Sequence, residues 1–202
     1  MTDFIQYYPD NGSEPSEKTQ AWLYYDDFGI YLGFKCFDRN KDSISIALGV
    51  RDSGPGTHDD LVSVLFCPYN DGTNYFYFLV TPTNVQTDVI YSTNGQDKSW
   101  DAVWYSETSI NDNGWTTEIM IPYSALRFSK KEVQNWGFNV NRWNARRQEW
   151  STWNFISIDI NNWWTAVGEV QNITNIDHQD SIHEKHYVSG YVEKENISTT
   201  SE

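Results

Sequence analysis

Short hydrophobic runs fill most of the chain, and turn-forming residues separate them about every ten positions. The clearest alternation lies in residues 43–48, where Ile44, Ile46 and Leu48 share one face of a half-buried strand with a period of two. Residues 61–67 are apolar on both faces, which is typical of a central strand. Further strands are expected at 20–25, 30–37, 75–80, 85–91, 102–110, 115–121, 136–143, 149–156 and 166–173.

Turn motifs join these runs into a ladder of antiparallel strands. Residues Asn70-Asp71-Gly72-Thr73 form the clearest hairpin turn, and Asn111-Asp112-Asn113-Gly114 form another. Residues 1–19 are polar and rich in turn formers, and 122–128 predict one short helical turn. Because no long helical period occurs, the pattern predicts an all-β sandwich or barrel.

The composition adds a large aromatic content to this picture. The 202 residues suffice for one domain with a core, and they include 10 Trp, 13 Tyr and 10 Phe. Most of these rings are expected in the core, but an exposed ring can stack on the apolar face of a sugar. The net charge of −14 excludes nucleic acid as a partner, since phosphate backbones repel it.

Two cysteines, Cys36 and Cys67, lie within predicted strands. They are interpreted as buried free thiols, and one disulfide between them stays open as an alternative.

Two tryptophan pairs are candidates for contact with a ligand. Trp163 and Trp164 follow Asn161-Asn162 in a loop, where neighbouring side chains point opposite ways, so one can be buried and the other exposed. Trp100 and Trp104 share one face of an extended segment about 13 Å apart, which suits two sugar subsites or, as the favoured alternative, the core. Arg51 is a further candidate for ligand contact.

Three acids surround the Gly/Pro loop at 51–60, namely Asp52, Asp59 and Asp60. Calcium prefers oxygen ligands, so these carboxylates predict a structural calcium site, with ordinary capping of loop amides as the alternative. The sequence contains no Gly-x-Ser-x-Gly, phosphate-loop or His-Glu-x-x-His motif, so we predict a domain that is not an enzyme.

Nine stretches in this order resemble one known family, and they span roughly residues 3–176. They are Tyr24-Tyr25-Asp26-Asp27, Ile30-Tyr31-Leu32-Gly33, Arg51-Asp52, His58-Asp59-Asp60, Pro68-Tyr69-Asn70-Asp71-Gly72-Thr73-Asn74-Tyr75, Trp100-Asp101-Ala102-Val103-Trp104, Gly114-Trp115-Thr116-Thr117-Glu118, Ile121-Pro122-Tyr123-Ser124-Ala125-Leu126-Arg127-Phe128 and Trp136-Gly137-Phe138-Asn139. Together they look like the carbohydrate-binding module family 9-like domain that precedes an outer-membrane β-barrel in bacterial surface proteins.

The resemblance implies a jelly-roll-like antiparallel β-sandwich at 1–176 that binds poly- or oligosaccharides without catalysis, with calcium bracing its loops. Such modules accompany hydrolases and serve carbohydrate catabolism. The chain lacks the secretion signal of the family, so we expect a fragment of an exported protein that is periplasmic, outer-membrane-associated or extracellular. Residues 177–202 are expected to link this domain to a following element that is truncated here.

Two other functions stay open at this point. The domain can be an accessory or interaction domain of an outer-membrane β-barrel protein, without a sugar site and with all its rings buried. It can also be a haem-binding relative of the same sandwich, which requires axial ligands from residues such as Met120 or His58.

Overall fold

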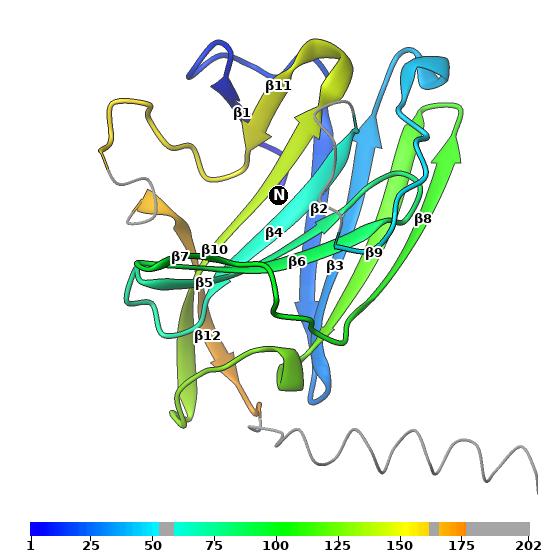
Figure 1. Cartoon of the computed structure of the whole chain (residues 1–202). Coiled ribbons are helices and arrows are strands. Elements are labelled where there is room, and N and C mark those ends of the chain that lie inside the picture. The colour runs from blue at the N-terminus through cyan, green and yellow to red at the C-terminus, as the bar shows by residue number, and fades with distance from the viewer. Residues whose placement is uncertain (53–58, 162–165, 177–202) are drawn as a thin grey trace, which may run out of the picture.

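A computed structural model describes residues 1–52, 59–161 and 166–176, and within them the chain is almost entirely β-structure (Figure 1). The strands are β1 (Ile5–Tyr8), β2 (Thr19–Tyr25), β3 (Gly29–Phe37), β4 (Leu61–Cys67), β5 (Asn74–Val80), β6 (Gln86–Ser92), β7 (Gly95–Asp97), β8 (Tyr105–Asn111), β9 (Gly114–Pro122), β10 (Val133–Asn144), β11 (Glu149–Thr152) and β12 (Gly168–Thr174). Single 3-10 turns lie at Lys41–Ser43, Tyr123–Ala125 and Ala145–Arg147. No helix in this part of the chain is long and apolar enough to cross a membrane.

The strands form two antiparallel sheets that face each other as layers (Figure 1). The larger sheet has the order β1-β11-β10-β4-β5-β6-β7, with β12 pairing along the other half of β10. The smaller sheet has the order β2-β3-β9-β8. The predicted all-β sandwich is therefore confirmed.

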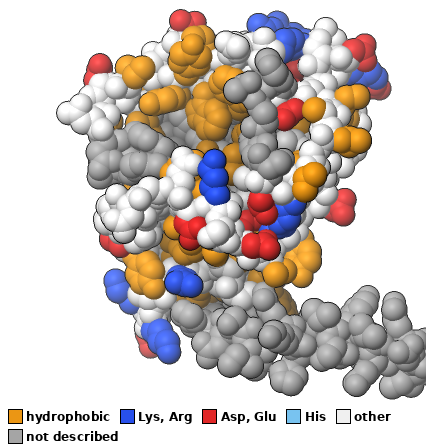
Figure 2. All heavy atoms as spheres, in the orientation of Figure 1, with side chains coloured by type: hydrophobic (Ala, Val, Ile, Leu, Met, Phe, Trp, Pro, Cys, Tyr) orange, Lys and Arg blue, Asp and Glu red, His pale blue; other side chains and the backbone are white. Residues whose placement is uncertain are grey.

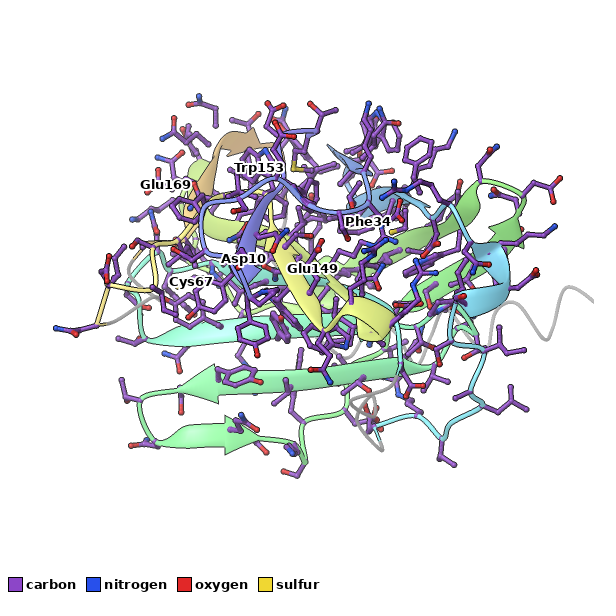
Figure 3. All side chains as sticks on the ribbon, turned by 90° about the horizontal axis from the view of Figure 1, so that it is seen from above. Asp10, Phe34, Cys67, Glu149, Trp153 and Glu169 are labelled. Atoms are coloured by element: carbon purple, nitrogen blue, oxygen red, sulfur yellow. The ribbon has the colours of Figure 1, made fainter. Side chains whose placement is uncertain are left out.

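The main core lies between the two layers and follows from strict alternation along the strands. In β3, Ile30, Leu32 and Phe34 point inward and are almost fully buried, and Figure 3 labels Phe34. They meet rings of the larger sheet, including Trp136 and Phe138, which pack against Phe66 with centroids 6.1 and 5.3 Å away. Burial of such rings supplies the main drive for folding.

A second hydrophobic cluster covers the outer face of the larger sheet. Leu61, Leu65 and Cys67 of β4 pack there with Tyr75 and Tyr77 of β5. Because the main core covers the opposite face of β4, all seven residues of this strand are buried. The prediction that 61–67 is a central strand is therefore confirmed.

The prediction of a strand at 43–48 is wrong. Ile44 is buried, but Ile46 and Leu48 are exposed, and the described residues 44–50 pair with no neighbouring strand. Side chains bind the backbone of this segment instead: the Asp60 carboxylate accepts from the Ser45 N–H, and the Thr83 hydroxyl donates to the Ala47 carbonyl. Period-two alternation can arise in any extended segment, so it does not by itself establish that a neighbouring strand is present.

Two short strands were not foreseen, β1 in the polar N-terminal stretch and β7 directly after β6. Both cysteines are free and buried, as the favoured interpretation predicts. On the face shown in Figure 2, hydrophobic side chains form separate patches among acidic and basic ones. The proposed linker at 177–202 lies outside the described residues and stays a prediction.

Candidate functional site

An open groove crosses the outer face of the smaller sheet. Strand register brings its residues together from four separate strands: Trp22 of β2 lies opposite Gly33, Gly33 opposite Glu118, and Glu118 opposite Glu107. The next row along the strands is Tyr24, Tyr31, Met120 and Tyr105. The groove has a volume of about 520 Å³, within the range of ligand sites.

Aromatic rings form the walls of this groove. Trp22 is 54% exposed, Tyr24 66% and Tyr105 59%, although large aromatics are usually mostly buried. The rings of Tyr24 and Tyr31 lie 6.1 Å apart at 46°. A Cβ atom on Gly33 would lie 3.7 Å from Cε3 of Trp22, so the indole lies over this glycine. The groove therefore presents flat apolar surfaces to the solvent.

The groove is also acidic. Glu107 and Glu118 are exposed neighbours on adjacent strands. At the hairpin between β2 and β3, desolvation alone would raise the pKa of Asp26, but N–H donors from Phe28 and Gly29 lower it below its ordinary value. Desolvation and a hydrogen bond to Asp26 raise the pKa of the Tyr31 hydroxyl, which stays protonated at neutral pH. The groove thus combines rings, carboxylates and hydroxyl donors.

Arg51 lies elsewhere, in a network between the loop at 51–60 and β6. Its guanidinium donates to the Asp88 carboxylate at 2.7 Å and to the Ala102 carbonyl at 2.6 Å. It also pairs with Asp52 and Asp101, each at 3.2 Å. Burial raises the pKa of Asp88, while hydrogen bonds from Trp104 and Ala102 and the charge of Arg51 act in the opposite direction. These contacts give Arg51 a structural role, and its predicted contact with a ligand stays a prediction.

Trp104 lies in the core, which was the favoured alternative for this ring, and not on a surface that a ligand can reach. The ring is 3% exposed, its N–H donates to Asp88 at 2.8 Å, and it packs edge-on against Phe78. Trp100 is partly buried and packs against Phe76 and Phe78 with centroids 5.2 and 5.6 Å away. Trp104 therefore has no free face for a sugar, whereas Trp100 packs against the core and stays partly exposed, so its contact with a ligand stays a prediction.

The three acids of the predicted calcium site do not come together as one group. Asp60 is buried and accepts N–H bonds from Ser45 and Ala145, and Asp59 accepts from the Ser45 hydroxyl. Burial raises the pKa of Asp60, and the two backbone bonds oppose this shift. Capping of loop amides, the alternative interpretation, therefore describes Asp60.

Asp52 instead meets Asp88 and Asp101, the one group of three acids with mutually close oxygens among residues 1–52, 59–161 and 166–176. The Arg51 guanidinium contacts all three of these carboxylates and supplies the positive charge between them. These three carboxylates do not fit a calcium ion while the Arg51 guanidinium lies between them. Structural calcium stays a prediction that no contact in the described residues supports.

Trp163 and Trp164 lie outside the described residues, so their role as a stacking platform stays a prediction. Sequence reasoning missed Trp22 and Tyr105, and treated Tyr24 only as part of a motif. One signal was available, because the stretch Gln20–Tyr25 carries large apolar residues on both faces. In a two-layer sandwich a strand of the smaller sheet buries one face, so such a stretch places rings outside.

Known proteins resemble this chain in structure, whereas comparison of the sequence finds no match. No family model matches the chain, and no curated protein sequence does.

Three solved structures share the arrangement of strands. A family 9 carbohydrate-binding module (CBM9) of Caldicellulosiruptor kristjanssonii in complex with glucose superposes with a TM-score of 0.54 at 15% identity, over 84% of this chain and 81% of that one. The same organism's family 9 module with cellotriose gives 0.55 at 16% identity, over 90% and 84%. A Bacteroides uniformis protein, provisionally named as carbohydrate-binding, gives 0.65 at 13% identity, over 87% of each chain.

Identities of 13–16% establish likeness of fold, while function is determined by the side chains of the site. The fold implied by the nine sequence stretches is thereby confirmed. The chain has the two-layer β-sandwich fold of the family 9 carbohydrate-binding modules.

Proposed function

We propose that this domain binds glycans without catalysing their conversion, and that the groove on the outer face of β2, β3, β9 and β8 is the binding site. The observation that carries the proposal is the exposure of Trp22, Tyr24 and Tyr105 along one groove. The similar structures with glucose and cellotriose support glucose-based chains as the first ligands to test.

The chemistry of the groove suits a sugar chain. A pyranose ring has an apolar face that can lie flat on an indole or phenol ring, and its hydroxyls need hydrogen-bond partners at the ring edge. Trp22 supplies the flat surface, and Glu118 of β9 and Glu107 of β8 supply acceptors further across the sheet. The distance from β2 to β8 is three strand spacings, roughly 14 Å, so the groove fits an oligosaccharide better than a single ring.

The accessory-domain alternative predicts that all rings are buried, and the exposed rings of the groove count against it. Several finer expectations rest on the resemblance alone and stay predictions: export to the periplasm, outer membrane or exterior, a role in carbohydrate catabolism, structural calcium, and a following outer-membrane β-barrel.

Isothermal titration calorimetry with cello-, xylo- and chito-oligosaccharides tests the proposal. We expect dissociation constants between micromolar and millimolar, weakened at least about tenfold, or ~1.4 kcal/mol, in Trp22→Ala. Tyr69→Ala is the matched control, because Tyr69 is 49% exposed but does not line the groove. The variants Trp163→Ala and Trp164→Ala run in parallel as tests of the loop predicted from sequence.

The outcomes separate the two sites. Loss of binding in Trp22→Ala with retention in the two loop variants supports the groove. Loss in Trp163→Ala or Trp164→Ala, with full affinity in Trp22→Ala, would move the sugar site to the loop. Absence of heat from every glycan would overturn the function itself.

A further inference from the structure

Two glutamates face each other in the groove. Glu107 and Glu118 are directly opposite in the register of β8 and β9, which places their Cβ atoms about 5 Å apart. Like charges in this position weaken a sheet unless a cation lies between them. The pairs on either side are Met120 with Tyr105 and Thr116 with Ser109, so β8 and β9 place no basic side chain diagonal to either glutamate.

No cation from the described surroundings compensates this pair. The residues lining the groove include no Lys, Arg or His. Lys35 of β3 is diagonal to Glu118 in the β3–β9 pair. Its ammonium group lies over the Phe37 ring, 4.9 Å from the ring centroid. Phe37 is further from Gly33 along β3 than Lys35 is, so this charge lies away from Gly33. The nearby hairpin adds the Asp26 carboxyl, whose pKa is lowered, at the Tyr31 end of the groove.

Rings and carboxylates together favour a ligand with a positive charge. A cation is attracted to the faces of Trp and Tyr, and the attraction grows when the site is partly desolvated. The indole of Trp22 lies over Gly33, and Glu118 is one strand spacing, about 5 Å, from that glycine. A sugar stacked on Trp22 therefore has its edge substituents beside the Glu107–Glu118 pair.

We infer that the groove prefers glycans that carry protonated amino groups, such as glucosamine oligosaccharides, over neutral and acidic ones. The inference rests on the proposed function and names its ligand class. A neutral N-acetylated chain would keep the stacking contact but lose the ion pairs. A uronic-acid chain would meet two carboxylates and be repelled.

The experiment compares four soluble probes by calorimetry at pH 5.5 and equal ionic strength: a glucosamine hexamer, an N-acetylglucosamine hexamer, cellohexaose and an oligogalacturonate. We expect the glucosamine hexamer to bind at least about tenfold more tightly than either neutral chain, and the oligogalacturonate not to bind. The double variant Glu107→Gln/Glu118→Gln should reduce the glucosamine affinity to that of the neutral chains. Glu14→Gln/Glu132→Gln, which removes two exposed acids outside the groove, is the charge-matched control and should change nothing.

Failure of this inference differs from failure of the proposed function. Equal affinity for charged and neutral chains, with loss of both in Trp22→Ala, overturns the charge preference and leaves glycan binding standing. If the preference for the glucosamine hexamer persists in the double variant or in Trp22→Ala, the assignment of the binding site to this groove is overturned. A hexalysine peptide serves as a further control. If it binds as tightly as the glucosamine hexamer and loses the same affinity in the double variant, the groove recognises charge alone, and the preference for amino sugars is overturned. Silence of all four glycans overturns both proposals.

Discussion

At the scale of single residues, one buried carboxylate organises the region around the 51–60 loop. Asp88 is 1% exposed and accepts bonds from the Trp104 indole, the Ala102 N–H and the Arg51 guanidinium. The Asp88 N–H in turn donates to Asp52, which has a left-handed backbone conformation with φ 60°. A carboxylate in this setting is stable because donors on three sides offset its desolvation.

Asp88→Ala should therefore lower the free energy of unfolding by about 2–4 kcal/mol, because it leaves the buried Trp104 indole N–H and the Ala102 N–H without their acceptor and removes the buried partner of Arg51. Asp101→Ala is the matched control, since this partner of Arg51 is 77% exposed and should contribute less than about 1 kcal/mol. Urea denaturation of both variants measures the difference. Equal losses would mean that Asp88 is not the residue that organises the network.

Cys36 should make stability fall at alkaline pH. Burial raises the pKa of this thiol to about 12, whereas the unfolded thiol titrates near pH ~8.5. Above that value the unfolded state releases a proton that the folded state keeps, so unfolding becomes more favourable as pH rises toward 12. The contribution between pH 7 and pH 9.5 is about 1.4 kcal/mol.

Urea denaturation of the wild type and Cys36→Ala at these two pH values checks this expectation. The variant is less stable throughout but should lose less stability on the change to pH 9.5. The same loss in both proteins would show that Cys36 does not titrate differently on folding.

At the scale of elements, alternation located most strands because a strand between two layers has to bury every second side chain. The predicted run at 61–67 coincides with β4, and the runs at 30–37 and 115–121 lie within β3 and β9. The failures have one cause. β1 is a short edge strand that pairs with β11. In the segment at 44–50, side chains from elsewhere in the chain form hydrogen bonds with the backbone in place of a neighbouring strand. Both results depend on contacts distant in the sequence and not on the local pattern of hydrophobic residues.

The segment at 44–50 supports a sharp test, since the alternation put Ile44 and Leu48 on one buried face. In the structure Ile44 is 4% exposed and Leu48 90%. Ile44→Ala should cost about 2–4 kcal/mol, whereas Leu48→Ser should stay within about 0.5 kcal/mol of the wild type. Thermal and urea denaturation measure both. Comparable losses in the two variants would restore the buried strand predicted from the sequence.

At the scale of the whole molecule, the two-layer arrangement leaves the outer face of the smaller sheet open. The larger sheet covers its outer face with a second cluster, while the smaller sheet presents Trp22, Tyr24 and Tyr105 to solvent. A ligand bound there contacts all four strands of the smaller sheet, so binding should stabilise the entire domain.

A glycan at about ten times its dissociation constant should add ~1.4 kcal/mol of stability. For a chain of this length that corresponds to a rise in melting temperature of about 3–6 °C. Differential scanning fluorimetry with and without glycan measures the shift, which Trp22→Ala should reduce to at most about 1–2 °C and Tyr69→Ala should preserve. A shift of unchanged size in Trp22→Ala would place the ligand outside the groove.

The amino-acid pattern by itself determined that this chain forms antiparallel strands around buried aromatic rings, because strand period and turn chemistry are local properties. The tertiary structure alone decided which rings stay outside and which charges meet. β2 carries large residues on both faces, so its period of two cannot tell the core side from the solvent side. The row from Trp22 through Gly33 and Glu118 to Glu107 comes from two hairpins, β2–β3 and β8–β9, that lie far apart in the sequence. The register between β3 and β9 joins them, and packing of the whole sandwich settles it.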